Sequence, residues 1–108
     1  MNVPQQVKIV AHPQHWASPE SWAFTLEHDV QEDGTVVGSL REVDLVNEAG
    51  SLDELRLVMA EDLVDYAKEY MEAFEMYSRA PNRKGHLPSV LNVLIQQDVC
   101  RVAELIHA

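Results

Sequence analysis

The chain has 108 residues, of which 46% are hydrophobic and 24% are charged, and its 18 acidic residues outnumber its 8 basic ones to give a formal net charge of −10. This length favours a single domain, residues 1–108, with a modest hydrophobic core. Its negative surface repels phosphate backbones, so direct binding to nucleic acid is not expected. The same charge suits a basic protein partner, or it serves only to keep the protein in solution.

The single cysteine and the N-terminal sequence indicate where the protein resides. Cys100 has no second cysteine with which to form an internal disulfide, which fits a reducing cytoplasm. Residues 1–10 lack a positively charged leader followed by a long apolar run, so no signal peptide is expected. No apolar run reaches the length of a membrane span. We therefore expect a cytoplasmic protein that does not enter the membrane.

The first half of the chain is predicted to form strands. Residues 7–12 alternate in polarity as a short strand does, and residues 21–30 show one apolar and one mostly polar face, as in an antiparallel sheet covered on one side. Residues 31–34 end in Asp-Gly, which favours a hairpin turn into a partner strand at residues 35–40. Residues 43–47 resume the extended pattern, so these last two segments are either one long bulged strand or two short strands.

Motifs for catalysis or for metal binding are absent from the sequence. His12 and His15 lie three residues apart, but Pro13 prevents a regular helix between them and no neighbouring residue completes a ligand set. The chain has no Gly-rich phosphate loop, serine elbow or CxxC motif. We therefore expect a non-enzymatic protein with no catalytic residues, no metal and no cofactor.

One long helix is predicted from Ser51 to Tyr77. Ser51 and Glu54 form a capping box at its start, and the segment contains no glycine or proline. At 1.5 Å per residue the helix would be about 40 Å long, so the rest of the chain is expected to pack against it. Apolar residues recur at helical spacing to form a core-facing stripe: Leu52, Leu55, Met59, Leu63, Tyr66, Tyr70, Phe74 and Tyr77.

A second face of this helix is acidic. We call this face the acidic ridge, and it consists of Glu61, Asp65, Glu69 and Glu72. Like charges four residues apart destabilise a helix by about a few tenths of a kcal/mol each, and Lys68 offsets part of that cost. The ridge is the candidate partner-binding surface. It is equally explained as a solvated face, because the packed stripe supplies most of the stability of the helix.

The loop at residues 78–88 carries the chain's only basic cluster, which consists of Arg79, Arg83 and Lys84. Cations near the C-terminal end of a helix complement its negative dipole end, and this is the favoured interpretation. The alternative is a contact with nucleic acid or with an acidic neighbour. These three residues are therefore a secondary candidate site.

The C-terminal region is predicted to be helical. Pro88 suits the first turn of a helix, and Asp98 is a suitable cap for a last short helix. These apolar helices need a partner surface, which is either the long helix or the same segment of a second subunit. We therefore expect a homodimer or a higher homo-oligomer.

Strands followed by helices indicate an α+β domain, with a small antiparallel three-stranded sheet packed on one long helix and short C-terminal helices. Residues 7–77 would hold the sheet and the long helix. Residues 78–108 would form the loop and a helical appendage.

Over residues 7–75 this order of elements resembles the HicB-like antitoxin family. The matching features are the hairpin at Glu32–Gly34, the strand at Thr35–Val37 and the helix start at Gly50–Glu54. The resemblance implies a degenerate ribonuclease H-like fold without nuclease activity, self-association, and binding to a small basic RNA-cleaving toxin. The residues alone leave open a structural or regulatory oligomerising module, or a small ligand-binding protein.

Overall fold

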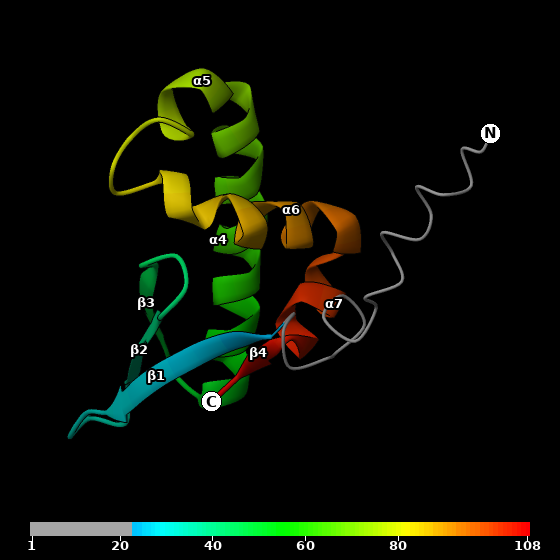
Figure 1. The fold of residues 1–108 in the computed structure, drawn as a ribbon. Coiled ribbons are helices and arrows are strands. Elements are labelled where there is room, and N and C mark those ends of the chain that lie inside the picture. The colour runs from blue at the N-terminus through cyan, green and yellow to red at the C-terminus, as the bar shows by residue number, and fades with distance from the viewer. Residues whose placement is uncertain (1–22) are drawn as a thin grey trace.

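The computed structural model describes residues 23–108, which form a sheet, one long helix and several short helices (Figure 1). In chain order the elements are β1 (Phe24–Val30), β2 (Val36–Leu40), β3 (Val46–Ala49), α4 (Leu52–Glu72), α5 (Phe74–Tyr77), the 3-10 helix η1 (Lys84–His86), α6 (Leu87–Gln96), α7 (Val99–Glu104) and β4 (Ile106–His107). The α+β class is confirmed. The strand predicted at residues 7–12 and the pair His12 and His15 lie outside the described residues.

The prediction of a three-stranded antiparallel sheet is wrong. Within residues 23–108 the sheet has four strands in the order β3-β2-β1-β4, and it is mixed because β4 runs parallel to β1. Phe24 N–H donates to the Leu105 carbonyl at 2.7 Å, and Phe24 pairs with Ile106. A strand of two residues is too short to show an alternating pattern, so residues 106–107 resembled the end of the last helix.

The antiparallel part of the sheet follows the sequence pattern closely. The Gln31 N–H donates to the Thr35 carbonyl at 2.8 Å, which closes the predicted hairpin, and Gly34 adopts a φ of 91° that favours glycine. β2 and β3 are separate antiparallel strands, so the second of the two alternatives for residues 35–47 is confirmed. Asp44, with φ 58°, turns the chain between them.

Helix α4 packs directly on the sheet at Gly38. A Cβ atom at this position would lie 2.9 Å from the side chains of both Leu26 and Leu55, so only glycine fits without displacement. The core forms around this contact. Its buried apolar residues are Phe24, Leu26, Val36, Leu40, Val43, Leu55, Met59, Ala60, Leu63, Tyr66, Ala67, Tyr70, Val90, Val93, Val102 and Ile106.

The predicted start of the long helix is confirmed. Ser51 Oγ accepts a hydrogen bond from the Glu54 N–H at 3.1 Å. The Glu54 carboxylate in turn accepts from the Gly50 N–H at 2.8 Å, so two free backbone donors are satisfied at this end. The local signals in residues 50–54 are therefore sufficient to set the first turn.

The predicted end of the helix at Tyr77 is wrong. α4 ends at Glu72, and Ala73, with φ −119° and ψ 43°, breaks the chain before the short helix α5. α5 curls back beside the end of α4 (Figure 1) and brings the Tyr77 ring to 5.5 Å from the Tyr70 ring, centroid to centroid. The break has no glycine or proline to mark it, and the Tyr77 ring beyond it still packs against the end of α4.

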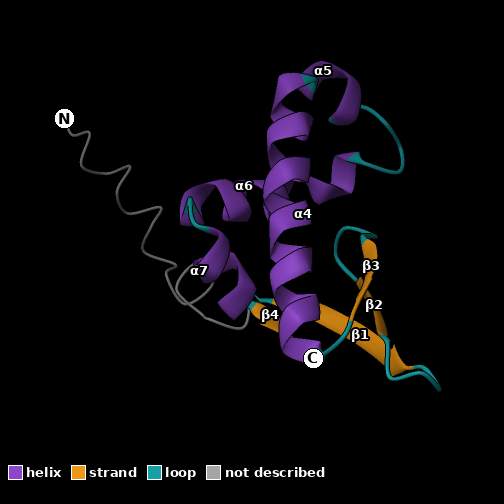
Figure 2. Cartoon of the chain, turned by 180° about the vertical axis from the view of Figure 1, so that it is seen from behind, coloured by secondary structure: helices purple, strands orange, loops and turns teal. Residues whose placement is uncertain are grey.

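The C-terminal helices pack on α4 beside the sheet, on the same side of the helix: β1 and α6 both cross in front of α4 in Figure 1, and both lie behind it in Figure 2. The small residues Ala60 and Ala67 are buried and leave room for α6 and α7. Asp98 caps α7 as predicted, because its Oδ1 accepts from the Cys100 N–H at 2.9 Å. Arg56 on α4 donates to the Ile106 carbonyl at 3.1 Å and thereby ties the last strand to the helix.

Candidate functional site

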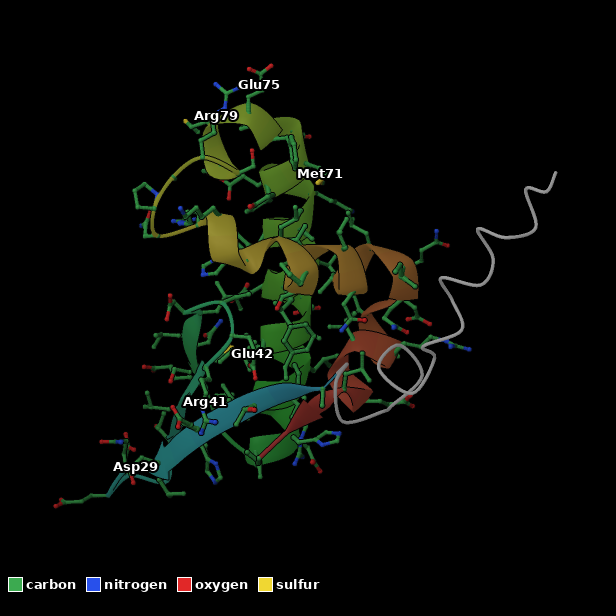
Figure 3. All side chains as sticks on the ribbon, in the orientation of Figure 1. Asp29, Arg41, Glu42, Met71, Glu75 and Arg79 are labelled. Carbon is green, nitrogen blue, oxygen red and sulfur yellow. The ribbon has the colours of Figure 1, made fainter. Side chains whose placement is uncertain are left out.

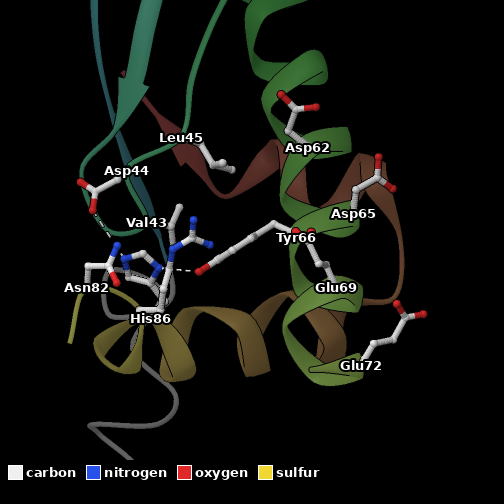
Figure 4. Close-up of a pocket in the computed structure, with 11 residues that line it drawn as sticks. Val43, Asp44, Leu45, Asp62, Asp65, Tyr66, Glu69, Glu72, Asn82 and His86 are labelled. Atoms are coloured by element: carbon white, nitrogen blue, oxygen red, sulfur yellow. Dashed lines mark hydrogen bonds and ion pairs between the residues drawn. The ribbon is translucent and has the colours of Figure 1, made fainter. Parts of the chain in front are cut away.

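An open groove of about 740 Å³ lies where α4, the β2–β3 loop and η1 meet (Figure 4). We call it the acidic groove, since four of its lining residues are carboxylates on α4. The complete lining is Val43, Asp44, Leu45, Asp62, Asp65, Tyr66, Glu69, Glu72, Asn82, Arg83 and His86.

The acidic ridge contributes three of its four residues to this groove. Asp65, Glu69 and Glu72 line it and are exposed, whereas Glu61 is exposed but does not line it. Asp62 lines the groove instead, although it is not among the site residues predicted from the sequence. The signal was available, because Asp62 precedes Asp65 by three residues and so shares its helix face.

Asp62 is held in place by the neighbouring strand. The side-chain amide of Asn47 on β3 donates to Asp62 Oδ2, and Asn47 Oδ1 accepts from the Glu48 N–H at 2.8 Å. Asn47 therefore uses both ends of its amide, one on α4 and one on the backbone of its own strand. This link holds β3 beside the face of α4 that carries the groove carboxylates.

A buried pair, Tyr66 and His86, forms the floor of the groove. The Tyr66 hydroxyl and His86 Nδ1 lie 2.7 Å apart, and only 8% of His86 is exposed. On the other side of the ring, His86 Nε2 lies 3.6 Å from Asp44 Oδ2, as the dashed lines in Figure 4 show. Burial raises the pKa of the Tyr66 hydroxyl, which keeps it protonated. The chain of contacts fastens the β2–β3 loop and η1 to α4.

The predicted basic cluster is divided by the fold. The Arg83 guanidinium lies 5.4 Å from the Tyr66 ring centroid and 5.3 Å from that of Tyr77, and its contact with the Tyr66 hydroxyl raises the pKa of Arg83. Such cation–π contacts stabilise the folded chain. Arg79 and Lys84 are both exposed. Arg83 is therefore a structural clamp between aromatic rings, and only the other two cations face solvent freely.

The lining residues suit the binding of positively charged groups. The carboxylates of Asp65, Glu69 and Glu72 form no salt bridge within residues 23–108, and the lining of the groove holds more carboxylates than cations, so it keeps an excess of negative charge. Residues 23–108 contain no group of three side chains arranged to hold a metal ion. In the same part of the chain, no helix is both long and apolar enough to cross a membrane.

Comparison with known proteins places the chain among antitoxins. A family model described as PHD-like, the antitoxin of RelE/RelB toxin–antitoxin systems, matches residues 10–108. A crystal structure from Syntrophomonas wolfei subsp. wolfei, described as an antitoxin part of a putative toxin/antitoxin system, is similar with a TM-score of 0.76 and 36% identity. The match covers 83% of this chain but only 64% of that one. No curated protein matches the chain.

These findings confirm the antitoxin class that the sequence resemblance implied. They do not confirm the HicB-like assignment, because the matching family model is the PHD-like one. The match begins near the N-terminus and extends to the last residue, so it includes the acidic groove and the C-terminal helices. The chain belongs to the PHD-like family of antitoxins from RelE/RelB toxin–antitoxin systems.

Proposed function

We propose that this antitoxin is non-enzymatic and neutralises a small basic RNA-cleaving toxin by binding it at the acidic groove. The observation that carries the proposal is the row of three exposed carboxylates on α4, Asp65, Glu69 and Glu72, which have no salt-bridge partner in the described chain. A toxin that cleaves RNA must bind a polyanion, so its active surface is basic. The carboxylates of the groove would bind this basic surface in competition with RNA.

The energetics of α4 favour a basic partner. Asp65 and Glu69, which are four residues apart, repel each other in the free protein, as do Asp62 and Asp65, which are three apart. Lysine or arginine side chains from a partner would remove this repulsion and add charge-assisted hydrogen bonds. The net charge of −10 would also steer a basic protein toward the chain and raise the association rate.

The geometry supports the groove as the centre of this surface. The Tyr66–His86 pair and the Asn47–Asp62 bond hold the surrounding segments to α4, so the carboxylates are presented from a fixed framework. A preorganised surface loses less conformational entropy on binding. Glu61 lies outside the groove, so we assign it a smaller part in toxin binding than Asp65 and Glu69.

The basic loop does not support a second, nucleic-acid-binding function. Arg83 is engaged by two tyrosine rings, which leaves Arg79 and Lys84 as its exposed cations. Glu72 and Glu75 on the same end of the helices are exposed as well, so the local charge does not favour a phosphate backbone.

Charge reversal tests the proposal. The antitoxin is co-expressed with any small basic protein encoded beside its gene, and the affinity of the pair is measured by titration calorimetry for wild type and for the double variant Asp65→Lys/Glu69→Lys. Reversing two groove charges is expected to cost about 2 kcal/mol of binding free energy, which raises the dissociation constant roughly thirtyfold. Affinity of the unaltered protein should fall as salt is raised.

The matched control is Asp29→Lys/Glu32→Lys, which makes the same change in net charge at the exposed hairpin end. Asp29 lies far from α4 and α5 in Figure 3. This control should weaken binding no more than about threefold, through long-range steering alone. Equal losses for the two double variants would mean that the groove is not the contact surface. If the neighbouring basic protein does not bind the antitoxin at all, the proposal that it is the toxin partner is wrong.

A further inference from the structure

His86 is a buried titratable side chain to which the toxin-binding proposal gives only a structural part. It is 8% exposed and lies in the floor of the acidic groove, between Tyr66 and Asp44 (Figure 4). Histidine is the side chain that ordinarily gains or loses its charge between about pH 5 and pH 8. A change in the protonation of His86 therefore changes the charge of the groove floor near neutral pH.

The contact between His86 and Tyr66 does not depend on the charge of the imidazole. The Tyr66 hydroxyl lies 2.7 Å from His86 Nδ1. A hydroxyl both donates and accepts hydrogen bonds, so it donates to a bare ring nitrogen and accepts from a ring N–H. Both forms of His86 can therefore stay attached to α4, and protonation adds a charge to the groove without removing this bond.

The opposite side of the ring faces charged groups. His86 Nε2 lies 3.6 Å from Asp44 Oδ2 on the β2–β3 loop, which is longer than a normal hydrogen bond, so this attraction is mainly one between charges. Lys84, on η1 with His86, is exposed. The other charged residues that line the groove with His86 are Asp62, Asp65, Glu69 and Glu72 on α4 and Arg83 in the loop before η1. A cation that binds these carboxylates comes close to the imidazole.

We propose that protonation of His86 weakens the binding of cationic partners at the acidic groove, and that such binding releases a proton from His86. This inference rests on the proposed function, since it concerns the regulation of the same site. A bound lysine or arginine side chain repels an imidazolium, whereas a neutral imidazole adds no such repulsion. Affinity is therefore highest above the titration range of histidine and falls as the pH drops through that range. One released proton changes the dissociation constant by at most about tenfold per pH unit.

N-acetylated decalysine, a peptide of ten lysines, tests the proposal without an identified toxin. Lysine side chains ordinarily titrate near pH 10.4 and carboxylates near pH 4, so the charge of this probe and of most carboxylates stays nearly constant between about pH 5.5 and pH 7.5. Titration calorimetry of the wild-type chain should give a dissociation constant roughly five- to tenfold higher at the lower pH. His86→Asn keeps a polar group near Tyr66 but carries no charge, so its dissociation constant should change less than about twofold. His28→Asn is the matched control, because His28 is exposed on β1, and it should behave like wild type.

Proton release gives a readout that a purely structural role of His86 would not produce. Calorimetry near pH 6.5 in two buffers of different ionisation enthalpy should detect about half a proton released per wild-type complex, and none for His86→Asn. The Cε1–H resonance of His86 in wild-type protein follows the same event by NMR. Decalysine should move the titration of this resonance to lower pH, and by more than that of His28.

The outcomes separate this inference from the proposed function. If decalysine does not bind, or binds Asp65→Lys/Glu69→Lys as tightly as wild type, the groove is not a cation site and both proposals are wrong. If that double variant binds more weakly but wild type and His86→Asn share one pH dependence, only the regulation by His86 is wrong. Should His86→Asn fail to fold, the NMR titration of the wild-type protein decides, and a His86 resonance that decalysine leaves unmoved would overturn the inference.

Discussion

Replacing Tyr66 with phenylalanine removes one oxygen atom from the floor of the acidic groove and leaves the ring in place. The lost hydroxyl lies 2.7 Å from His86 Nδ1, and His86 is 8% exposed, so water has little access to the nitrogen that is left unpaired. An unsatisfied buried polar atom costs about 1–3 kcal/mol. His86 keeps its more distant contact with Asp44, at 3.6 Å, which favours the lower part of that range. We expect a loss of about 1–2 kcal/mol, or a melting temperature lower by roughly 4–16 °C for a domain of this size.

Tyr77→Phe is the matched control for this prediction. Tyr77 belongs to the same ring cluster, 6.5 Å from Tyr66 between centroids, but its hydroxyl forms no hydrogen bond in the described chain. Urea denaturation followed by circular dichroism measures both variants. Tyr77→Phe should change stability by less than about 0.5 kcal/mol, as substitutions away from buried polar groups usually do. If the two variants lose the same stability, the Tyr66–His86 bond does not hold the groove together.

Alkaline pH gives a second readout of the same side chain. Burial raises the pKa of Tyr66 in the folded protein above its ordinary value of about 10. Between the unfolded and the folded pKa, the unfolded chain has lost this proton while the folded chain still binds it. Stability is therefore fully present below pH 10 and falls as pH rises from there toward the folded pKa. Tyr66→Phe should show a shallower decline over that interval than wild type, and parallel declines would count against the buried tyrosine as the cause.

Two backbone positions give further predictions. Gly38→Ala places a Cβ atom 2.9 Å from the side chains of Leu26 and Leu55, so it should destabilise the fold by about 1–3 kcal/mol in urea denaturation, and a neutral effect would show that α4 is not tightly seated on β2. Gln97→Gly should raise stability by about 1 kcal/mol, because Gln97 ends α6 with a φ of 59° that glycine adopts without strain. A lower melting temperature for this variant would mean that the Gln97 side chain makes a stabilising contact.

The sequence predicts where an element starts or ends when that boundary is set by residues close to it in the chain. The hairpin at Asp33–Gly34 and the helix start at Ser51 are both encoded within five residues, and both are confirmed. The end of α4 is not encoded this way, since no glycine or proline marks the break at Ala73, and the Tyr77 ring beyond it packs against Tyr70. β4 depends on a pairing with Phe24, which is distant in sequence. Such features follow from tertiary packing, which a local pattern does not contain.

The candidate site could likewise be predicted from the sequence only in part. Helical spacing alone predicts that Asp65, Glu69 and Glu72 share a face, and the structure places them together in the groove. What lies opposite that face depends on which loops the fold brings to it. His86 is a loop histidine by sequence, and only the packing of η1 against Tyr66 makes it a buried part of the floor. The role of Arg83 changes for the same reason, from an exposed cation to a clamp between rings.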